Sequence, residues 1–470
     1  MSCRSYRLAI PLMGKGATNH IHKREVIEHF IKQGINILFL VRKDYLPLLE
    51  KIPECDYLPV DIPILPKWTK IIHETCLNIR KRYPSTDFGH RQRFIQAHLD
   101  CRFGGKILNY CYLFLARFYF IIKLLIKLEG LVLMRWDTLM HDRREAFDQL
   151  LLMGMGAYGA EIEGRFTWWA RKNKVSTVHI VGNYDNLSSK GFRGAPISRL
   201  LVWGKNMRRD AQRIQHIDLD SVSEIGSIRY DCLRLSSLKT KVMEKKSFVE
   251  KIGLDPSKKT IVFAGLYFES QYFEMLSLFD EIHHERKDCQ LILRVYPSKH
   301  FMHSIYMKPL LEYSERKDNV AVSLADPYYK MGSRNLEVLQ IEEFELWNIL
   351  NSCDVLVNNY STIALEGCLF DKPVIHMTYI PNTSGVLARD PVYYRYSEFT
   401  HNRRLASYNA AKVSRNREEL KKHIYESLEN PGELARARNN LVNDEIGARD
   451  GLVCARLVNA CREEFLEFYQ

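Results

Sequence analysis

The residues with the clearest chemical logic lie in the segment CDVLVNNYSTIALEGCLFDKPVIHMTY, residues 353–379. Its pattern predicts a buried strand, a tight turn, a short helix that begins at Ser361 and Thr362, and a second buried strand. The N-terminus of such a helix offers backbone N–H groups and a positive dipole end, which together bind phosphate. Glu366 follows Thr362 by one turn on the same face, where its carboxylate could bind a ribose. We therefore expect Ser361, Thr362 and Glu366 to hold a nucleotide.

A plainer interpretation makes Ser361 an ordinary helix cap and Glu366 a solvated surface residue. A capping box requires the glutamate three residues after the cap, and Ala364 or Leu365 stands there instead. The helix IALEGCLF is otherwise apolar nearly all round, so its carboxylate should be buried and should need a partner. Arg294, at the end of the predicted strand in LILRVYPS, is expected in the same crevice, where it could neutralise a pyrophosphate. A surface ion pair is the alternative role for Arg294.

A second polar segment, VGNYDNLSSKGFRG at residues 181–194, follows another predicted strand. Asp185 comes directly after that strand and is our first candidate for a general base. Lys190 could stabilise a leaving phosphate. Asp-Asn pairs also build ordinary turns, so a structural role stays open. Glu161 and His20 are reserve candidates for the base.

Apolar runs of four to eight residues alternate with amphipathic stretches, which is typical of an α/β fold with parallel strands. A polar, lysine-rich stretch at residues 236–260 separates two halves of similar size. The sequence therefore predicts two α/β domains, residues 1–240 and 241–470. Strands are expected at 7–13, 35–41, 175–181, 199–204, 290–298, 319–326, 354–359 and 373–379.

Composition limits the classes of protein that fit. The eleven cysteines of this 470-residue chain are scattered and form no C-x-x-C pair, which argues against a disulfide framework and a structural zinc site. The chain carries a formal net charge of +12, yet no recognisable nucleic-acid-binding motif accompanies the positive charge. The apolar run LAIPLM is too short for a signal peptide. We expect a cytoplasmic protein that binds no nucleic acid.

Much of the positive charge falls in residues 66–130, where twelve Lys/Arg stand against four Asp/Glu. Within this basic insertion, residues 106–130 are aromatic and aliphatic but include Arg117, Lys123 and Lys127. Three cations disfavour a membrane-spanning helix. Two interpretations stay open: a helix that lies in the headgroup plane of an anionic leaflet, or a core helix whose lysines reach outward to water.

The segment DVLVNNYSTIALEGCLFDKPVI resembles the donor-site segment of two-domain GT-B nucleotide-sugar enzymes. The resemblance is to bacterial surface-polysaccharide glycosyltransferases and the related CDP-glycerol glycerophosphotransferases. Residues 181–194 are similar to a block at the end of the N-terminal domain of such enzymes. Further blocks match in order, and the similarity runs from about residue 155 to the C-terminus. The matching blocks are LLVWGKNMRRDA, IGSIRYD and ARDGLVCARLVNAC.

The resemblance implies two Rossmann-like domains that face each other across a cleft, the GT-B fold. It implies a donor nucleotide in the C-terminal domain, held by Ser361, Thr362 and Glu366, and an acceptor in the N-terminal domain. The glycerophosphotransferases have two histidines where this chain has Tyr296 and the segment around Asp185. Sugar transfer is therefore favoured over polyol-phosphate transfer.

The expected activity is transfer of a sugar from a nucleotide-activated donor to a lipid-linked or saccharide acceptor, in the synthesis of a bacterial cell-surface polysaccharide. Helix amides, Arg294 and Lys190 could stabilise the leaving group, so we expect no metal and no cofactor besides the donor. The expected place is the cytoplasm; in the interpretation where residues 106–130 lie in the headgroup plane, it is the inner face of the cytoplasmic membrane, with an anionic membrane surface as a further partner. A polyol-phosphate transferase, a sugar-nucleotide epimerase and a non-catalytic nucleotide-sugar-binding protein are the alternatives.

Overall fold

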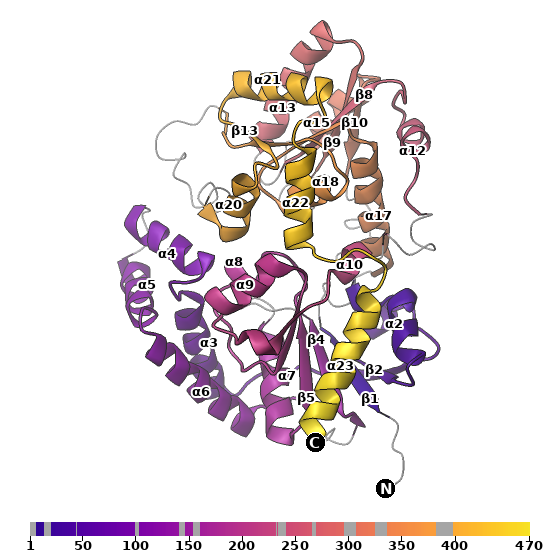
Figure 1. Cartoon of the computed structure of the whole chain (residues 1–470). Helices are drawn as coiled ribbons and strands as arrows, with labels where there is room; N and C mark the ends of the chain where they lie inside the picture. The colour runs from indigo at the N-terminus through magenta and orange to yellow at the C-terminus, as the bar shows by residue number, and fades with distance from the viewer. Residues whose placement is uncertain are drawn as a thin grey trace. The chain divides into compact units, whose positions relative to one another are not determined.

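Figure 1 shows the computed structural model of the chain, which forms two compact units. The first unit combines residues Met1–Leu235 with Asp444–Gln470, and the second comprises Ser236–Asn443. The residues that the structure describes are 6–13, 20–43, 45–98, 103–140, 146–153, 160–231, 233, 241–265, 269–295, 307–324, 336–381 and 398–470.

The first unit is built on a parallel sheet. Within the described residues it has seven strands in the order β3-β2-β1-β4-β5-β6-β7, and the pairs are parallel. The strand order reverses between β1 and β4, the place where open α/β sheets bind ligands. The strands are β1 (Arg7–Leu12), β2 (Asn36–Arg42), β3 (Asp56–Val60), β4 (Gln149–Met153), β5 (Ser176–Ile180), β6 (Arg199–Val202) and β7 (Val222–Glu224).

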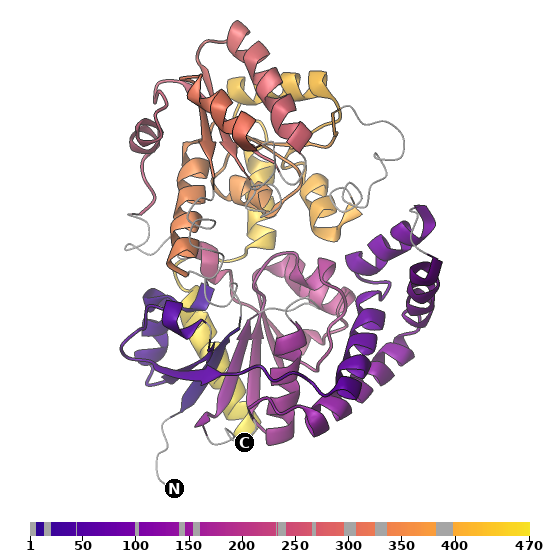
Figure 2. The same ribbon diagram turned by 180° about the vertical axis from the view of Figure 1, so that it is seen from behind.

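Helices cover this sheet and extend beyond it on one side (Figure 2). They are α2 (Arg24–Ile31), η1 (Leu46–Leu48), α3 (Lys67–Lys81), α4 (Asp87–His98), α5 (Phe103–Leu115), α6 (Tyr119–Trp136), α7 (Ala160–Asn173), α8 (Asn186–Ser189), α9 (Lys205–Arg213), η3 (Leu219–Ser221), α10 (Ile228–Asp231) and α23 (Val453–Tyr469). α7 packs on β4 and β5, and α6 packs on α7 and α3. α3 and α6 therefore form a layer outside α7.

The strands at the centre of this sheet are apolar because helices cover both faces. β4, with the sequence QLLLM, is buried along its whole length, and β5 is buried likewise. Strands covered on both faces carry continuous apolar runs instead of an alternating pattern. Phe166 and Trp169 of α7 complete this core together with Leu150 and Leu152 of β4.

The second unit repeats this architecture. Within the described residues its sheet has six parallel strands in the order β10-β9-β8-β11-β12-β13. In sequence order this is 3-2-1-4-5-6, the Rossmann arrangement, which reverses between β8 and β11. Its strands are β8 (Lys259–Ala264), β9 (Cys289–Arg294), β10 (Val320–Ser323), β11 (Val355–Asn358), β12 (Val374–Met377) and β13 (Lys412–Ser414). Its helices are α12 (Lys245–Lys251), α13 (Glu269–Glu285), α15 (Met307–Glu315), α17 (Leu336–Ser352), α18 (Thr362–Leu369), α20 (Thr400–Ser407), α21 (Arg417–Glu429) and α22 (Ala435–Glu445), the last of which crosses the boundary between the units.

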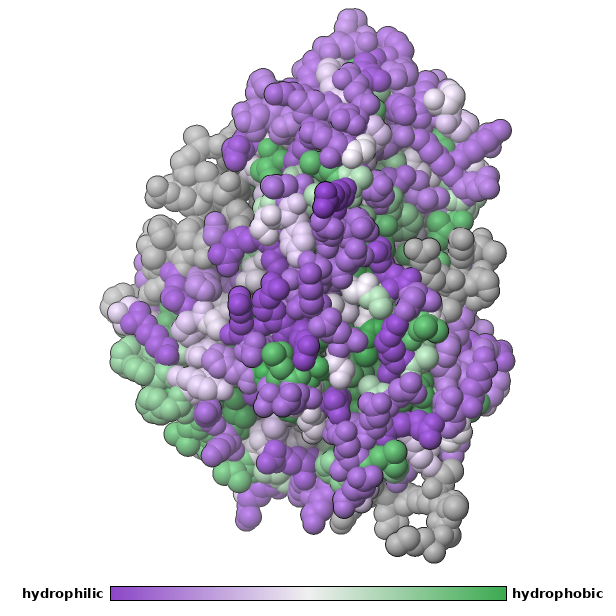
Figure 3. Space-filling model, viewed as in Figure 1, coloured by the Kyte–Doolittle hydropathy of each residue, from purple (hydrophilic) through white to green (hydrophobic). Residues whose placement is uncertain are grey.

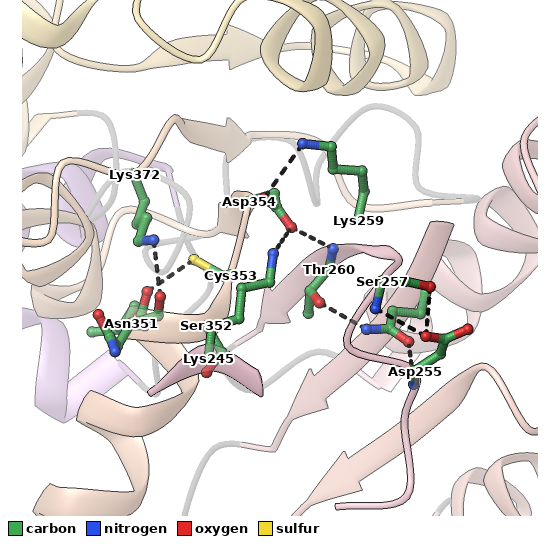
Figure 4. Close-up of polar contacts among 12 residues, drawn as sticks. Lys245, Asp255, Ser257, Lys259, Thr260, Asn351, Ser352, Cys353, Asp354 and Lys372 are labelled. Carbon is green, nitrogen blue, oxygen red and sulfur yellow. Dashed lines mark hydrogen bonds and ion pairs between the residues drawn. The ribbon is translucent and has the colours of Figure 1, made fainter. Parts of the chain in front are cut away.

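A polar network fastens the amino ends of β8 and β11 (Figure 4). The Thr260 amide donates to Oδ2 of Asp354 at 2.7 Å, and the Asp354 amide donates to the Thr260 carbonyl at 2.8 Å. Lys245 of α12 pairs with the same carboxylate at 2.6 Å. These bonds fix the register of the two strands, so that their carboxyl ends also lie side by side.

The α/β prediction and the two Rossmann-like sheets are confirmed. The division of the chain differs from the prediction, because residues Asp444–Gln470 belong to the first unit and the break falls after Leu235. Specific bonds hold the returning segment. Oδ2 of Asp231 accepts the Val453 amide at 2.9 Å, and Nε2 of Gln149 donates to the Cys461 carbonyl at 3.0 Å.

Residues 106–130 form parts of two helices instead of one. α5 ends at Leu115 and α6 begins at Tyr119, and the chain bends at Arg117. Only one side of α6 is buried, with Ile122 and Leu133 among its buried residues. Among the described residues, no helix is both long and apolar enough to cross a membrane.

Candidate functional site

The predicted nucleotide site lies where the strand order of the second sheet reverses. β8 and β11 pair in parallel, with Ala264 opposite Asn358 at their carboxyl ends. The next residue, Gly265, passes close to two rings: a Cβ atom there would lie 2.8 Å from Phe263 and 2.9 Å from Tyr272. Only glycine lets the backbone leave β8 at this point without displacing these rings.

α18 begins directly after β11, with Ser361 as its N-cap residue. The Ser361 backbone is extended, and its side chain makes no capping hydrogen bond. N-cap serines usually bond an amide of the first turn, so here the Ser361 hydroxyl retains capacity for an anionic ligand. Of the first-turn amides, that of Ala364 donates to the Ser361 carbonyl at 2.9 Å. Ser361 and Thr362 are both half-buried. The structure thus places the two residues at the helix start, as the sequence predicts.

The turn before α18 contains a residue in an unfavourable backbone conformation. Tyr360 has a φ of 46°, in the left-handed region that non-glycine residues seldom occupy. Its ring stacks on His376 with centroids 4.0 Å apart, and Nδ1 of His376 lies 3.1 Å from Oδ1 of Asn358. Burial lowers the pKa of His376 to about 3, so this imidazole is neutral. Strain of this kind is common where a loop is held for a ligand.

Sequence reasoning missed the roles of Tyr360 and His376. The histidine within the apolar strand VIHM could have indicated a role for His376, because a buried imidazole needs a hydrogen-bond partner. The strain at Tyr360 has no local sequence signal, since tyrosine does not favour a positive φ.

Glu366 is 2% exposed, so the solvated-surface interpretation of this residue is wrong. It lies in a helix whose residues from Ile363 to Cys368 are all buried. Burial lowers the pKa of the Arg294 guanidinium, and the carboxylates of Glu345 and Glu366 act against this shift. Arg294 and Glu366 therefore share one electrostatic environment, although they stand 72 positions apart in the sequence (366 − 294).

Arg294, at the end of β9, is buried and bonded to neighbouring side chains. Its Nη1 donates to Oγ of Ser323 at 3.0 Å and lies 3.8 Å from Oε1 of Glu345. The Ser323 hydroxyl in turn donates to Glu345. With 5% exposure, Arg294 is not the surface ion pair of the alternative interpretation. Tyr296, which follows it, lies outside the described residues.

In the first unit, Asp185 and Lys190 come together. Nζ of Lys190 lies 3.2 Å from Oδ2 of Asp185, and the Ser189 hydroxyl donates to the same oxygen at 2.7 Å. Asp185 is 7% exposed. These bonds build the loop itself, which is the structural role that sequence reasoning left open for Asp185.

The loop at residues 181–194 is also fixed from outside. Nε2 of Gln215 donates to the Leu187 carbonyl at 2.7 Å and to the Gly191 carbonyl at 3.0 Å. Nη1 of Arg80, from α3, donates to the Phe192 carbonyl at 2.9 Å. The loop is therefore held by α3 and by the residues after α9.

The reserve candidates for the base follow β1 and β4 in the sequence. His20 is half-buried, and the side chain of Glu161 lies outside the described residues. His22, two residues after His20, bonds the Tyr57 hydroxyl at 2.9 Å, and burial lowers its pKa to about 4. A residue that sequence reasoning missed is Glu163, in the first turn of α7, which follows β4. Its buried Oε2 makes no hydrogen bond in the described part of the chain, and burial raises the pKa of this carboxyl well above its usual value.

No group of three or more His, Cys, Asp or Glu that could hold a metal ion occurs among the residues described. Among the described residues, the Arg294 guanidinium and the dipole of α18 contribute positive charge at the site in the second unit.

No protein-family model and no curated protein matches the sequence. The chain is similar to several solved structures. The S. aureus MnaA–UDP structure matches with a TM-score of 0.51 at 11% identity, over 98% of this chain and 97% of that chain. A UDP-N-acetylglucosamine 2-epimerase gives 0.51 at 12% identity, over 99% and 97%. A variant of the wall teichoic acid polymerase TagF gives 0.49 at 9% identity, over 98% and 89%.

The chain is an α/β protein of the GT-B fold class, with two Rossmann-like domains. This assignment rests on the two sheets and on the two matches with a TM-score of 0.51. Identities of 11% and 12% establish the fold alone.

Proposed function

We propose that this protein is a glycosyltransferase that takes a sugar from a nucleotide-activated donor, bound in the second unit. One observation carries the proposal: the Glu366 carboxylate is buried one turn into α18, in the same electrostatic environment as Arg294, where the strand order reverses. In this proposal the Glu366 carboxylate accepts a ribose hydroxyl, while the start of α18 binds the phosphates.

The proposed acceptor is a lipid-linked or saccharide hydroxyl of a cell-surface polysaccharide. Its oxygen attacks the anomeric carbon of the sugar, the bond from that carbon to the diphosphate oxygen breaks, and the hydroxyl proton passes to a base. The amides at the start of α18, together with Arg294, would stabilise the nucleoside diphosphate as it leaves. No metal is required in this scheme.

Two residues compete for the role of base in the first unit. Asp185 is the candidate from the sequence, but its carboxylate already pairs with Lys190 and accepts the Ser189 hydroxyl. Burial raises the pKa of the Glu163 carboxyl, which makes its carboxylate a stronger base. Its position after β4 also places it at the strand reversal of the first sheet.

The donor site is tested by the melting temperature of the protein with UDP-, GDP-, CDP- and CMP-linked sugars. A ligand at 100 times its Kd stabilises the unit that binds it by about 2.7 kcal/mol, which corresponds to a rise of several degrees for a unit of this size. We expect one base to give this rise and the others to give less. If no nucleotide raises the melting temperature, the donor site is refuted.

Separate substitutions of the loop and helix residues identify the base. With Asp185→Asn and Lys190→Met, we expect unchanged donor affinity, and a kcat reduced about 10²–10⁴-fold for the residue that takes part in proton transfer. Glu163→Gln serves as the comparison. Loss of turnover in Glu163→Gln alone would assign the base to α7 and leave Asp185 and Lys190 as builders of the loop. Wild-type turnover in all three variants would exclude each of them from the reaction.

An epimerase acting on the same class of donor is the second candidate, because the raised pKa of Glu163 also suits acid–base chemistry on a sugar carbon. An epimerase would exchange a carbon-bound hydrogen of the sugar with solvent deuterium in the absence of an acceptor. A glycosyltransferase would show no such exchange and would release nucleoside diphosphate only with an acceptor. A polyol-phosphate transferase would release a nucleoside monophosphate, and a non-catalytic protein would bind donor without any of these products.

A further inference from the structure

α6 presents to solvent a continuous stripe in which large apolar residues alternate with cations. The exposed residues repeat every three or four positions along the helix, and therefore share one face. Leu124 and Leu131 are each 63% exposed and Phe120 is 68% exposed. The exposed members of the stripe are Phe120, Lys123, Leu124, Lys127, Leu128, Leu131 and Arg135.

α5 and the bend before α6 extend this surface. Ile107, Tyr110 and Phe114 of α5 are each more than half exposed. The rings of Phe114 and Phe118 lie 5.5 Å apart, and those of Phe118 and Phe120 lie 5.8 Å apart. Figure 3 shows the resulting hydrophobic area over α5 and α6. We call this surface, formed by the exposed residues of 106–136, the α5–α6 face.

The charges of the α5–α6 face have one sign. The single acidic residue between Lys106 and Trp136 is Glu129, and it is 2% exposed. Both oxygens of the Glu129 carboxylate accept hydrogen bonds from Arg80, at 3.1 and 3.2 Å. The cations of the face, by contrast, are exposed at Arg117, Lys123 and Lys127. The face is therefore apolar and positive.

The exposed apolar residues and cations of the α5–α6 face fit an anionic lipid bilayer better than a protein core or a second copy of this chain. A core helix would bury its apolar residues, and here more than six large ones are exposed along two consecutive helices. A symmetric dimer would place the same face against itself, so lysines would lie against lysines. An anionic bilayer supplies both requirements: an apolar layer for the phenylalanine and leucine side chains, and negative headgroups for the cations.

We propose that the α5–α6 face lies in the headgroup region of an anionic lipid bilayer. The proposal goes beyond sugar transfer and does not depend on it. The face is joined to the candidate loop, because Arg80 bonds Glu129 of α6 and also the Phe192 carbonyl. Membrane contact would thus hold the loop with Asp185 and Lys190 at a fixed distance from the lipid surface.

The test is flotation of the full chain with vesicles of phosphatidylcholine alone and of phosphatidylcholine with phosphatidylglycerol. We expect binding to the anionic vesicles that weakens with salt. The variant Lys123→Gln/Lys127→Gln should bind them about 30-fold less well, at roughly 1 kcal/mol per lysine. The control Lys308→Gln/Lys422→Gln removes the same charge from two exposed lysines of the second unit and should bind like the wild type.

The variant Phe120→Ser/Leu124→Ser separates the apolar contribution, because it keeps every charge. We expect it to lose binding at low and high salt while its melting temperature matches the wild type, since both side chains are exposed. Absence of vesicle binding by the wild type would overturn the proposal. So would equal loss of binding in the Lys308/Lys422 control, or a dimer in solution that dissociates in Phe120→Ser/Leu124→Ser without any vesicle binding.

Discussion

Replacing Glu129 with alanine is expected to lower the free energy of unfolding of the first unit by about 3–5 kcal/mol, the usual cost of breaking a buried ion pair. Arg80 is 1% exposed, so its guanidinium would keep its burial and lose its counter-charge. Nδ1 of His73, which lies 2.6 Å from Oε1 of Glu129, would lose its partner as well. Hydrogen exchange of the α3 and α6 amides measures the loss.

A matched control and a double variant separate the causes. Glu74→Ala removes a half-exposed carboxylate from α3, where it pairs with Lys70 at 3.8 Å, and should cost less than about 1 kcal/mol. Arg80→Met combined with Glu129→Leu should recover much of the stability, because neither charge stays buried alone. Equal effects of Glu74→Ala and Glu129→Ala would show that the buried pair contributes nothing specific.

The same pair predicts a pH dependence. Burial alone would raise the pKa of Glu129, but Arg80 and His73 outweigh it and hold the pKa below its ordinary value of 4.5. The stability from this carboxylate is therefore fully present above pH 4.5 and is lost as the pH falls through the lowered pKa. Glu129→Gln should lack this part of the acid-induced destabilisation. An unchanged acid profile in Glu129→Gln would contradict the assignment.

Glu366→Gln is expected to weaken donor binding about 10–100-fold while leaving the unit folded. The substitution preserves shape and removes the charge, and a hydrogen bond to a charged group contributes roughly 1.5–3 kcal/mol. Isothermal titration with the nucleotide selected by the melting experiment measures the affinity. Since Glu366 also acts on Arg294, the melting temperature of the free variant is recorded beside it.

Glu312→Gln provides the control, because this carboxylate is 43% exposed on α15 and pairs with surface cations. It should bind the donor like the wild type. Wild-type affinity in Glu366→Gln would remove the ribose contact from the proposal while leaving the phosphate contact at Ser361 and Thr362 to be tested in turn.

Local sequence patterns predicted much of the scaffold. The expected strands at 7–13, 175–181 and 354–359 correspond to β1, β5 and β11, because parallel strands covered on both faces carry unbroken apolar runs. The helix at Ser361 and the burial of Glu366 were likewise predicted, since a helix that is apolar on every side has no face suited to solvent. Five strands, β3, β4, β7, β8 and β13, were not among the expected ones. β3 is partly exposed, and β7 and β13 are three residues long, so these three carry no such run. β4 and β8 are buried and apolar, and their runs were overlooked.

The tertiary structure decided features that depend on residues far apart in the chain. Asp444–Gln470 returns to the first unit through bonds to Asp231 and Gln149, and no local pattern encodes such a return. The segment at residues 181–194 is a loop held by its own Asp185–Lys190 pair and by Arg80.

Sequence alone did not decide whether residues 106–130 form a core helix or a helix at a membrane surface. Both interpretations have the same residues, and they differ only in which face the rest of the protein covers. The fold covers the side of α6 that carries Glu129 and leaves Phe120 and Leu124 exposed. Periodicity fixes which residues share a face of a helix, whereas packing against α3 and α7 determines which face is buried.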